Sequence, residues 1–78
     1  MTVARAILSV LENVKPYLLP QRTLLVDVST QVASVTPTEL KTELTSLESR
    51  GLVVSVRNEL DGDLRFRITD AGVAALRG

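Results

Sequence analysis

The chain has 78 residues and nine basic and nine acidic side chains, so its formal net charge is zero. Apolar residues make up 45% of it, which is typical of one small folded domain and excludes a disordered chain. Because cysteine and histidine are both absent, disulfides, thiolate or imidazole catalysis and the common zinc sites are excluded.

The first predicted element is an amphipathic helix over residues 2–15. Thr2 supplies a hydroxyl group that can cap its N-terminus. Pro16 disfavours helical geometry at Lys15 and so ends the helix. The apolar residues that recur at helical spacing are Val3, Ile7, Val10, Leu11 and Val14.

The apolar face of this helix is broad, because Ala4 and Leu8 lie beside the main stripe. Such a face either packs against two elements of the same chain or extends onto a second subunit. A homodimer is the second possibility, and for it we assign the interface to Ala4, Leu8 and Leu11.

A short strand and a second helix are predicted next. Residues 17–19 are apolar and precede a proline, which an edge strand tolerates. The second helix is predicted over residues 21–34. Its stripe consists of Leu24, Val28, Val32 and Val35, spaced by four, four and three residues. Many β-branched residues lower the helix propensity of this segment, so the helix depends on burying the stripe.

The third helix, predicted over residues 37–50, has the clearest local signals. Thr36 occupies the N-cap, Pro37 the first helical position and Glu39 the position three after the cap, which are the parts of a capping box. Gly51 is the expected C-terminal stop. The buried stripe comprises Leu40, Leu44 and Leu47.

Two alternating segments, residues 52–57 and 64–69, are predicted to form a β-hairpin. A two-residue turn places Arg57 opposite Phe66, on the core-facing side. A three-residue loop over residues 60–62 puts Gly62 where a left-handed residue is needed. We favour the second register, because a one-residue slip turns an apolar face outward. Its pairs are Val56 with Phe66 and Val54 with Ile68.

The last predicted element is a short helix over residues 70–77, capped by Thr69 or Asp70, with Val73 and Leu76 facing inward. The elements therefore follow one another as helix, short strand, helix, helix, hairpin and short helix.

This order resembles the winged helix-turn-helix superfamily, and two motifs carry the resemblance. The first is LESRGLV, residues 47–53, where the third helix runs into the hairpin. The second is FRITDAG, residues 66–72, which is similar to the exit from the wing in MarR-type and PadR-type repressors. The resemblance implies an α+β fold in a single domain over residues 1–78. That fold has a three-helix core with a helix-turn-helix, a β-hairpin wing and a short C-terminal helix.

The resemblance also implies binding to double-stranded DNA, with the third helix in the major groove and the wing on the backbone or minor groove. Carried over by position, the DNA-reading face is Thr38, Lys41, Thr42, Thr45 and Ser49. Helical geometry places the hydroxyl side chains opposite the leucine stripe, and hydroxyls can bond phosphate oxygens and base edges. The same pattern also fits the solvent-exposed side of an amphipathic helix.

The charge of the third helix weakens the DNA interpretation, because duplex binding generally depends on several lysine or arginine contacts. The helix contains two basic residues, Lys41 and Arg50, and three acidic residues. Its net charge is therefore minus one. The acidic residues are Glu39, Glu43 and Glu48.

Three arginines of the hairpin partly offset this charge. The favoured register pairs Arg57 with Arg65 and places Arg67 on the same outward face. Like charges directly opposite each other destabilise a sheet, so a nearby anion is expected. That anion is either a DNA phosphate or the acidic wing tip, which departs from DNA-binding wings. The acidic residues of the tip are Glu59, Asp61 and Asp63.

Two functions follow from these observations. The first is a DNA-binding, transcription-regulator-like protein that acts as a homodimer. The second is a protein-interaction winged helix, an adaptor or subunit without nucleic-acid binding, which the zero net charge and the apolar first helix favour.

Asp61 and Asp63 flank a turn glycine, where aspartate commonly bonds the backbone. No enzymatic activity, metal, cofactor or small-molecule ligand is therefore expected. No apolar run approaches the roughly 20 residues of a membrane span, so we expect a soluble, cytoplasmic protein.

Overall fold

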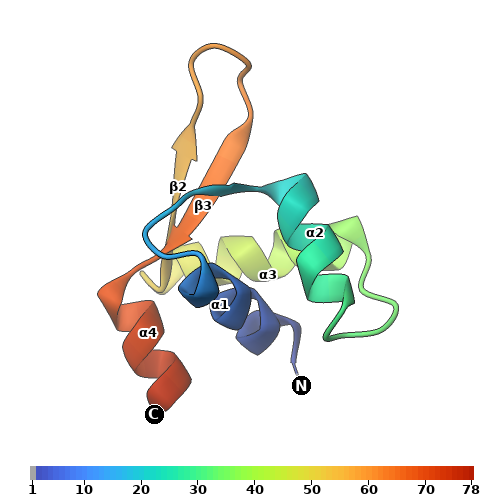
Figure 1. Ribbon diagram of the computed structural model, residues 1–78, viewed down its shortest axis with the longest axis vertical. Helices are drawn as coiled ribbons and strands as arrows, with labels where there is room; N and C mark the ends of the chain where they lie inside the picture. Colours follow the sequence, from blue (N-terminus) through green and yellow to red (C-terminus); the bar gives the residue numbers. More distant parts are fainter. Residues whose placement is uncertain (1) are drawn as a thin grey trace.

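The computed structural model describes residues 2–78, and its elements follow the predicted order. They are α1 (Val3–Asn13), β1 (Leu19–Pro20), α2 (Gln21–Ser29), α3 (Pro37–Ser49), β2 (Val53–Arg57), β3 (Leu64–Ile68) and α4 (Asp70–Arg77). The helices α1, α2 and α3 form the body, and the β2–β3 hairpin projects from it (Figure 1). This is a winged helix of the α+β class, which confirms the predicted fold. None of the helices within residues 2–78 is long and apolar enough to cross a membrane.

The core is built around α1, which contacts α2, α3, α4 and β3. Its broad apolar face is therefore covered by elements of the same chain. Leu8 is only 5% exposed and Leu11 is fully buried, so neither has surface left for a second subunit. The predicted dimer interface at these two residues is wrong for this reason. Ala4 is partly buried against the same core.

The helix α2 is shorter than predicted, because it ends at Ser29 instead of residue 34. The hydroxyl of Thr30 donates to the carbonyl of Asp27 at 2.7 Å, and the hydroxyl of Ser29 donates to the carbonyl of Leu25. Such local bonds compete with the continuation of a helix. Beyond its end, the partly buried side chains of Val32 and Val35 still pack against the core. The apolar stripe is thus satisfied by an irregular connection.

Local bonds fix both ends of α3. The hydroxyl oxygen of Thr36 accepts the backbone N–H of Glu39 at 3.1 Å, as the capping pattern predicts. At the other end, Gly51 has φ +74°, and the N–H of Leu52 donates to the carbonyl of Leu47 at 3.0 Å. This is a Schellman motif, which sets the direction in which the chain enters β2. The three leucines of the predicted stripe are all at most 2% exposed.

The sheet has the strand order β1-β3-β2, with β2 at the edge. The predicted hairpin register is wrong by one residue. The observed pairs are Val53–Ile68, Val54–Arg67, Ser55–Phe66, Val56–Arg65 and Arg57–Leu64. The cause is a loop of four residues, 59–62, closed by the N–H of Asn58 donating to the carbonyl of Asp63 at 2.9 Å. Gly62 is left-handed, as predicted, with φ +74°.

The third strand, β1, pairs with β3 through Leu19 and Pro20, so it lies one to two residues later than predicted. Tyr17, the predicted first residue of that strand, is 73% exposed.

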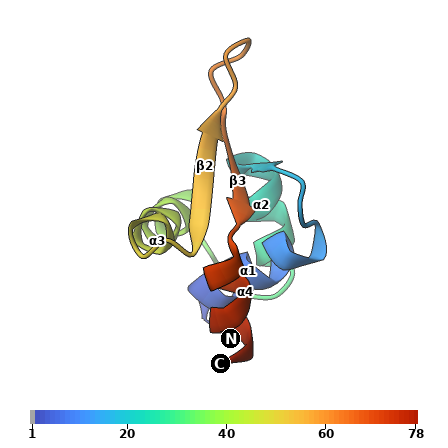
Figure 2. The same ribbon diagram turned by 90° about the vertical axis from the view of Figure 1, so that its left-hand side faces the viewer.

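The helix α4 lies at the end of the sheet opposite the wing tip, beside α1 (Figure 2). Its N-cap is Thr69, whose hydroxyl oxygen accepts a hydrogen bond from the N–H of Gly72 at 3.1 Å. The same hydroxyl group donates to the carbonyl of Gly51 at 2.7 Å. Gly72 packs directly against the backbone carbonyl of Leu52, in the connection between α3 and β2. A Cβ built there would lie 2.3 Å from the carbonyl oxygen of Leu52 and 2.6 Å from Cγ1 of Ile68. The close approach of α4 to the sheet therefore depends on this glycine.

Candidate nucleic-acid interface

The outward face of α3 carries a row of four hydroxyl side chains, which the fold leaves uncovered. Thr38, Lys41, Thr42, Thr45 and Ser49 are all exposed. At 100° per residue, the four hydroxyl residues lie within about 30° of a common direction, and Lys41 lies about 70° to one side. Thr45 donates its proton to the carbonyl of Lys41 at 2.9 Å, which turns its oxygen into an acceptor only. Among residues 2–78, the hydroxyls of Thr38, Thr42 and Ser49 have no hydrogen-bond partner.

The acidic residues of α3 lie away from this row. Each of Glu39, Glu43 and Glu48 is at least about 90° from the centre of the row. Glu39 accepts a hydrogen bond from the hydroxyl of Thr36 at 3.2 Å, within the helix cap. Glu48 accepts a hydrogen bond from the hydroxyl of Ser55, on β2. The negative net charge of the helix is therefore not concentrated on its outward face.

The wing begins beside α3, because the edge strand β2 follows the helix directly and packs against it. In Figure 2, α3 and β2 lie next to each other, and the hairpin extends beyond them. The outward face of α3 and the β2 edge of the wing thus border the same side of the molecule.

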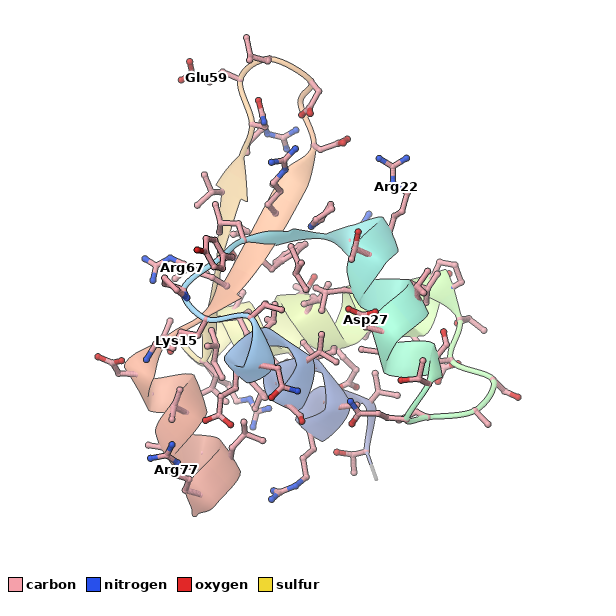
Figure 3. The ribbon with its side chains drawn as sticks, in the orientation of Figure 1. Lys15, Arg22, Asp27, Glu59, Arg67 and Arg77 are labelled. Atoms are coloured by element: carbon pink, nitrogen blue, oxygen red, sulfur yellow. The ribbon has the colours of Figure 1, made fainter. Side chains whose placement is uncertain are left out.

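The observed register separates the three arginines of the hairpin, so the predicted cluster is wrong. Arg57 lies opposite Leu64, on the face of the sheet that continues the core. Arg65 and Arg67 lie on the other face, opposite Val56 and Val54. Figure 3 shows Arg67 on the side of the sheet away from α2.

The anion that the arginines were expected to need is partly supplied within the wing. Nη2 of Arg65 lies 3.5 Å from Oδ2 of Asp61, so this arginine is neutralised internally. Arg67 is exposed and belongs to none of the ion pairs among residues 2–78.

The structure also brings together two arginines that sequence reasoning did not connect. A groove of about 410 Å³ runs between the start of α2 and the wing. Arg22 lines it from the helix side and Arg57 from the wing side. The other residues that line it are Pro20, Gln21, Gly62, Asp63 and Leu64. The signal that would have found this pair is the four-residue loop, because the loop length decides which face carries Arg57.

Comparisons with known proteins agree on the fold. No family model and no curated protein matches the chain. Among solved structures, it is similar to the PcaV transcriptional regulator from Streptomyces coelicolor, seen with its natural ligand. The identity is 28%, the TM-score is 0.81, and the match covers 99% of this chain and 50% of that one. A MarR-family transcriptional regulator from Silicibacter pomeroyi matches with 24% identity and TM-score 0.80, over 99% and 48% of the two chains.

A PadR-family transcription regulator from Clostridium difficile is also similar, with 15% identity and TM-score 0.81 over 96% of this chain and 79% of that one. The chain therefore has the winged-helix fold of MarR-family and PadR-family transcriptional regulators. It spans about half the length of the PcaV and MarR-family proteins. The proteins that it resembles are regulators and not enzymes.

Proposed function

We propose that this protein binds double-stranded DNA as a transcription-regulator-like module, with the outward face of α3 in the major groove. The observation that supports this most directly is the uncovered row of hydroxyl side chains beside the wing. The hydroxyls of Thr38, Thr42 and Ser49 are free of partners among residues 2–78, which suits them to bond base edges and phosphate oxygens. The similarity to transcriptional regulators supports the same function.

Phosphate contacts in this proposal come from cations at the edge of the row. Lys41 is exposed and belongs to none of the ion pairs among residues 2–78. It therefore neutralises a backbone phosphate without first losing a carboxylate partner. Arg67 is equally free on the wing, whereas Arg65 must separate from Asp61 before it can contact DNA.

We further propose that two copies act together on DNA in the cytoplasm. One module presents few free cations, and two linked half-sites multiply the affinity of a weak contact. Because Leu8 and Leu11 are buried, the interface does not involve them. Sedimentation of the protein alone and with a duplex measures whether the stoichiometry is two.

The DNA proposal is tested by fluorescence anisotropy of a labelled mixed-sequence duplex, titrated at low and at near-physiological salt. We expect micromolar binding that weakens steeply as salt rises, since counterions are released from the phosphates. Lys41→Ala should reduce the slope of log K against log salt by about 0.9, the value for one phosphate.

The chain offers a matched control for this variant. Lys15→Ala removes the same charge from the turn after α1, where the amine lies 3.2 Å from Oδ1 of Asp70. It should bind DNA like the unaltered protein. If the unaltered protein does not bind the duplex at low salt, DNA binding is wrong and the outward face of α3 is a surface for solvent or a partner protein.

A further inference from the structure

The groove between α2 and the wing has chemistry that the α3 contact does not use. Two arginines, 35 positions apart in the sequence, line it from different elements. Nη1 of Arg57 donates to the carbonyl of Gly62 at 2.8 Å, which holds this side chain along the wing. Arg22 points from the start of α2 toward the wing end of the molecule (Figure 3). Neither arginine belongs to an ion pair among residues 2–78.

The charge of the lining selects the kind of anion that fits. Asp63 also lines the groove, so the net charge of its ionised residues is plus one. Pro20 and Leu64 add apolar surface, and Leu64 is 37% exposed. A phosphodiester group carries a single negative charge and is flanked by the carbon surface of two sugars. It therefore matches the groove better than a free phosphate, which carries more charge and has no apolar surface.

We propose that Arg22 and Arg57 form a clamp for one phosphodiester group of the DNA backbone. This inference rests on the proposed binding of α3 to the major groove. With α3 in the major groove and the wing beside the next minor groove, the backbone strand that separates the two grooves runs past α3 and the wing, and we place one of its phosphates in the groove between the start of α2 and the wing. The clamp binds that strand without reading its sequence, since phosphate contacts fix position and register but not base identity.

The clamp implies that the carboxylate of Asp63 weakens DNA binding. Its carboxylate is exposed and repels the phosphate that the two arginines attract. The turn itself uses only backbone groups of this residue: its N–H donates to Oδ1 of Asp61 at 2.9 Å, and its carbonyl accepts from Asn58. The variant Asp63→Asn therefore keeps the turn and removes the repulsion.

The experiment is the same anisotropy titration, performed across a range of salt with the variants Arg22→Gln, Arg57→Gln, their double variant and Asp63→Asn. Loss of one phosphate contact lowers the salt slope by about 0.9 and the affinity at 50 mM salt by about tenfold. We expect that full effect in the double variant. Each single variant should show part of it, with a sum that differs from the double, because both arginines hold the same group.

Asp63→Asn should bind more tightly than the unaltered protein. The control is Arg77→Gln on α4, at the opposite end of the molecule from the wing (Figure 3), which should leave binding unchanged. All variants alter surface residues, and thermal unfolding by circular dichroism verifies that each one is folded.

The possible failures can be told apart. If binding persists and depends on Lys41, but the groove variants bind like the unaltered protein, the clamp is wrong and the α3 contact stands. If the effects of the two arginine substitutions simply add, the arginines hold different phosphates and the shared clamp is wrong. If the unaltered protein does not bind the duplex at low salt, both the clamp and the proposed function are overturned.

Discussion

Gly72→Ala is expected to destabilise this protein although alanine is the better helix former. In an exposed helix the substitution would add about 1 kcal/mol of stability. Here the new Cβ would lie 2.3 Å from the carbonyl oxygen of Leu52 and 2.6 Å from Cγ1 of Ile68. The carbonyl cannot retreat easily, because the N–H of Thr69 donates to it at 3.1 Å, and Ile68 is 1% exposed. Overpacking of this kind costs up to about 3 kcal/mol, so a net loss of about 2 kcal/mol remains.

That loss corresponds to a decrease in Tm of about 8–16 °C for a domain of this size. Thermal unfolding followed by circular dichroism measures it. The control is Ala75→Gly, an exposed position in the same helix, which loses only helix propensity and should lower Tm by about 4–8 °C. If Gly72→Ala melts at or above the temperature of the unaltered protein, α4 does not depend on close approach to the sheet.

Two further substitutions test the core and the helix cap. Leu8→Ala should cost about 2–5 kcal/mol, because its side chain is 5% exposed, and should leave the oligomeric state unchanged. Urea unfolding with light scattering measures both, and a change of oligomeric state without loss of stability would restore the dimer interface. Thr36→Ala should cost about 1 kcal/mol by removing the bond to the N–H of Glu39. Thr38→Ala, two residues further along and without such a bond, is its control, and equal effects of the two would rule out the cap.

Local chemistry explains why α3 could be predicted closely. Its start depends on Thr36 and Glu39, which are three residues apart, and its stop on Gly51, whose positive φ is a property of the residue itself. The interaction that defines each end therefore lies within a few residues of sequence. The outward row followed from the position of the leucine stripe, because helical periodicity alone places the two on opposite sides.

The sequence predictions were wrong where several local structures are compatible with the same residues. The hairpin register depends on whether the loop has two, three or four residues, and Gly62 is left-handed in the favoured and in the observed arrangement. In α2, the helical spacing of the valines continues past Ser29, but local hydroxyl bonds end the helix there. The breadth of the α1 face could not decide between a neighbouring element and a second subunit. Only the tertiary packing of Leu8 decides it.

The observed register of the β2–β3 hairpin also changes where the charges lie on the wing. A net charge of zero indicates a poor DNA binder only if the opposite charges are mixed evenly over the surface. Two of the three ion pairs among residues 2–78, Lys15–Asp70 and Arg77–Glu12, join α4 to α1 and to the turn that follows α1. Toward the wing, Arg57 leaves the face of Arg65 and joins Arg22 across the groove, while Asp61 is occupied by Arg65. Arg22 and Arg57, neither of which belongs to an ion pair among residues 2–78, therefore line one groove, although the composition of the chain is neutral.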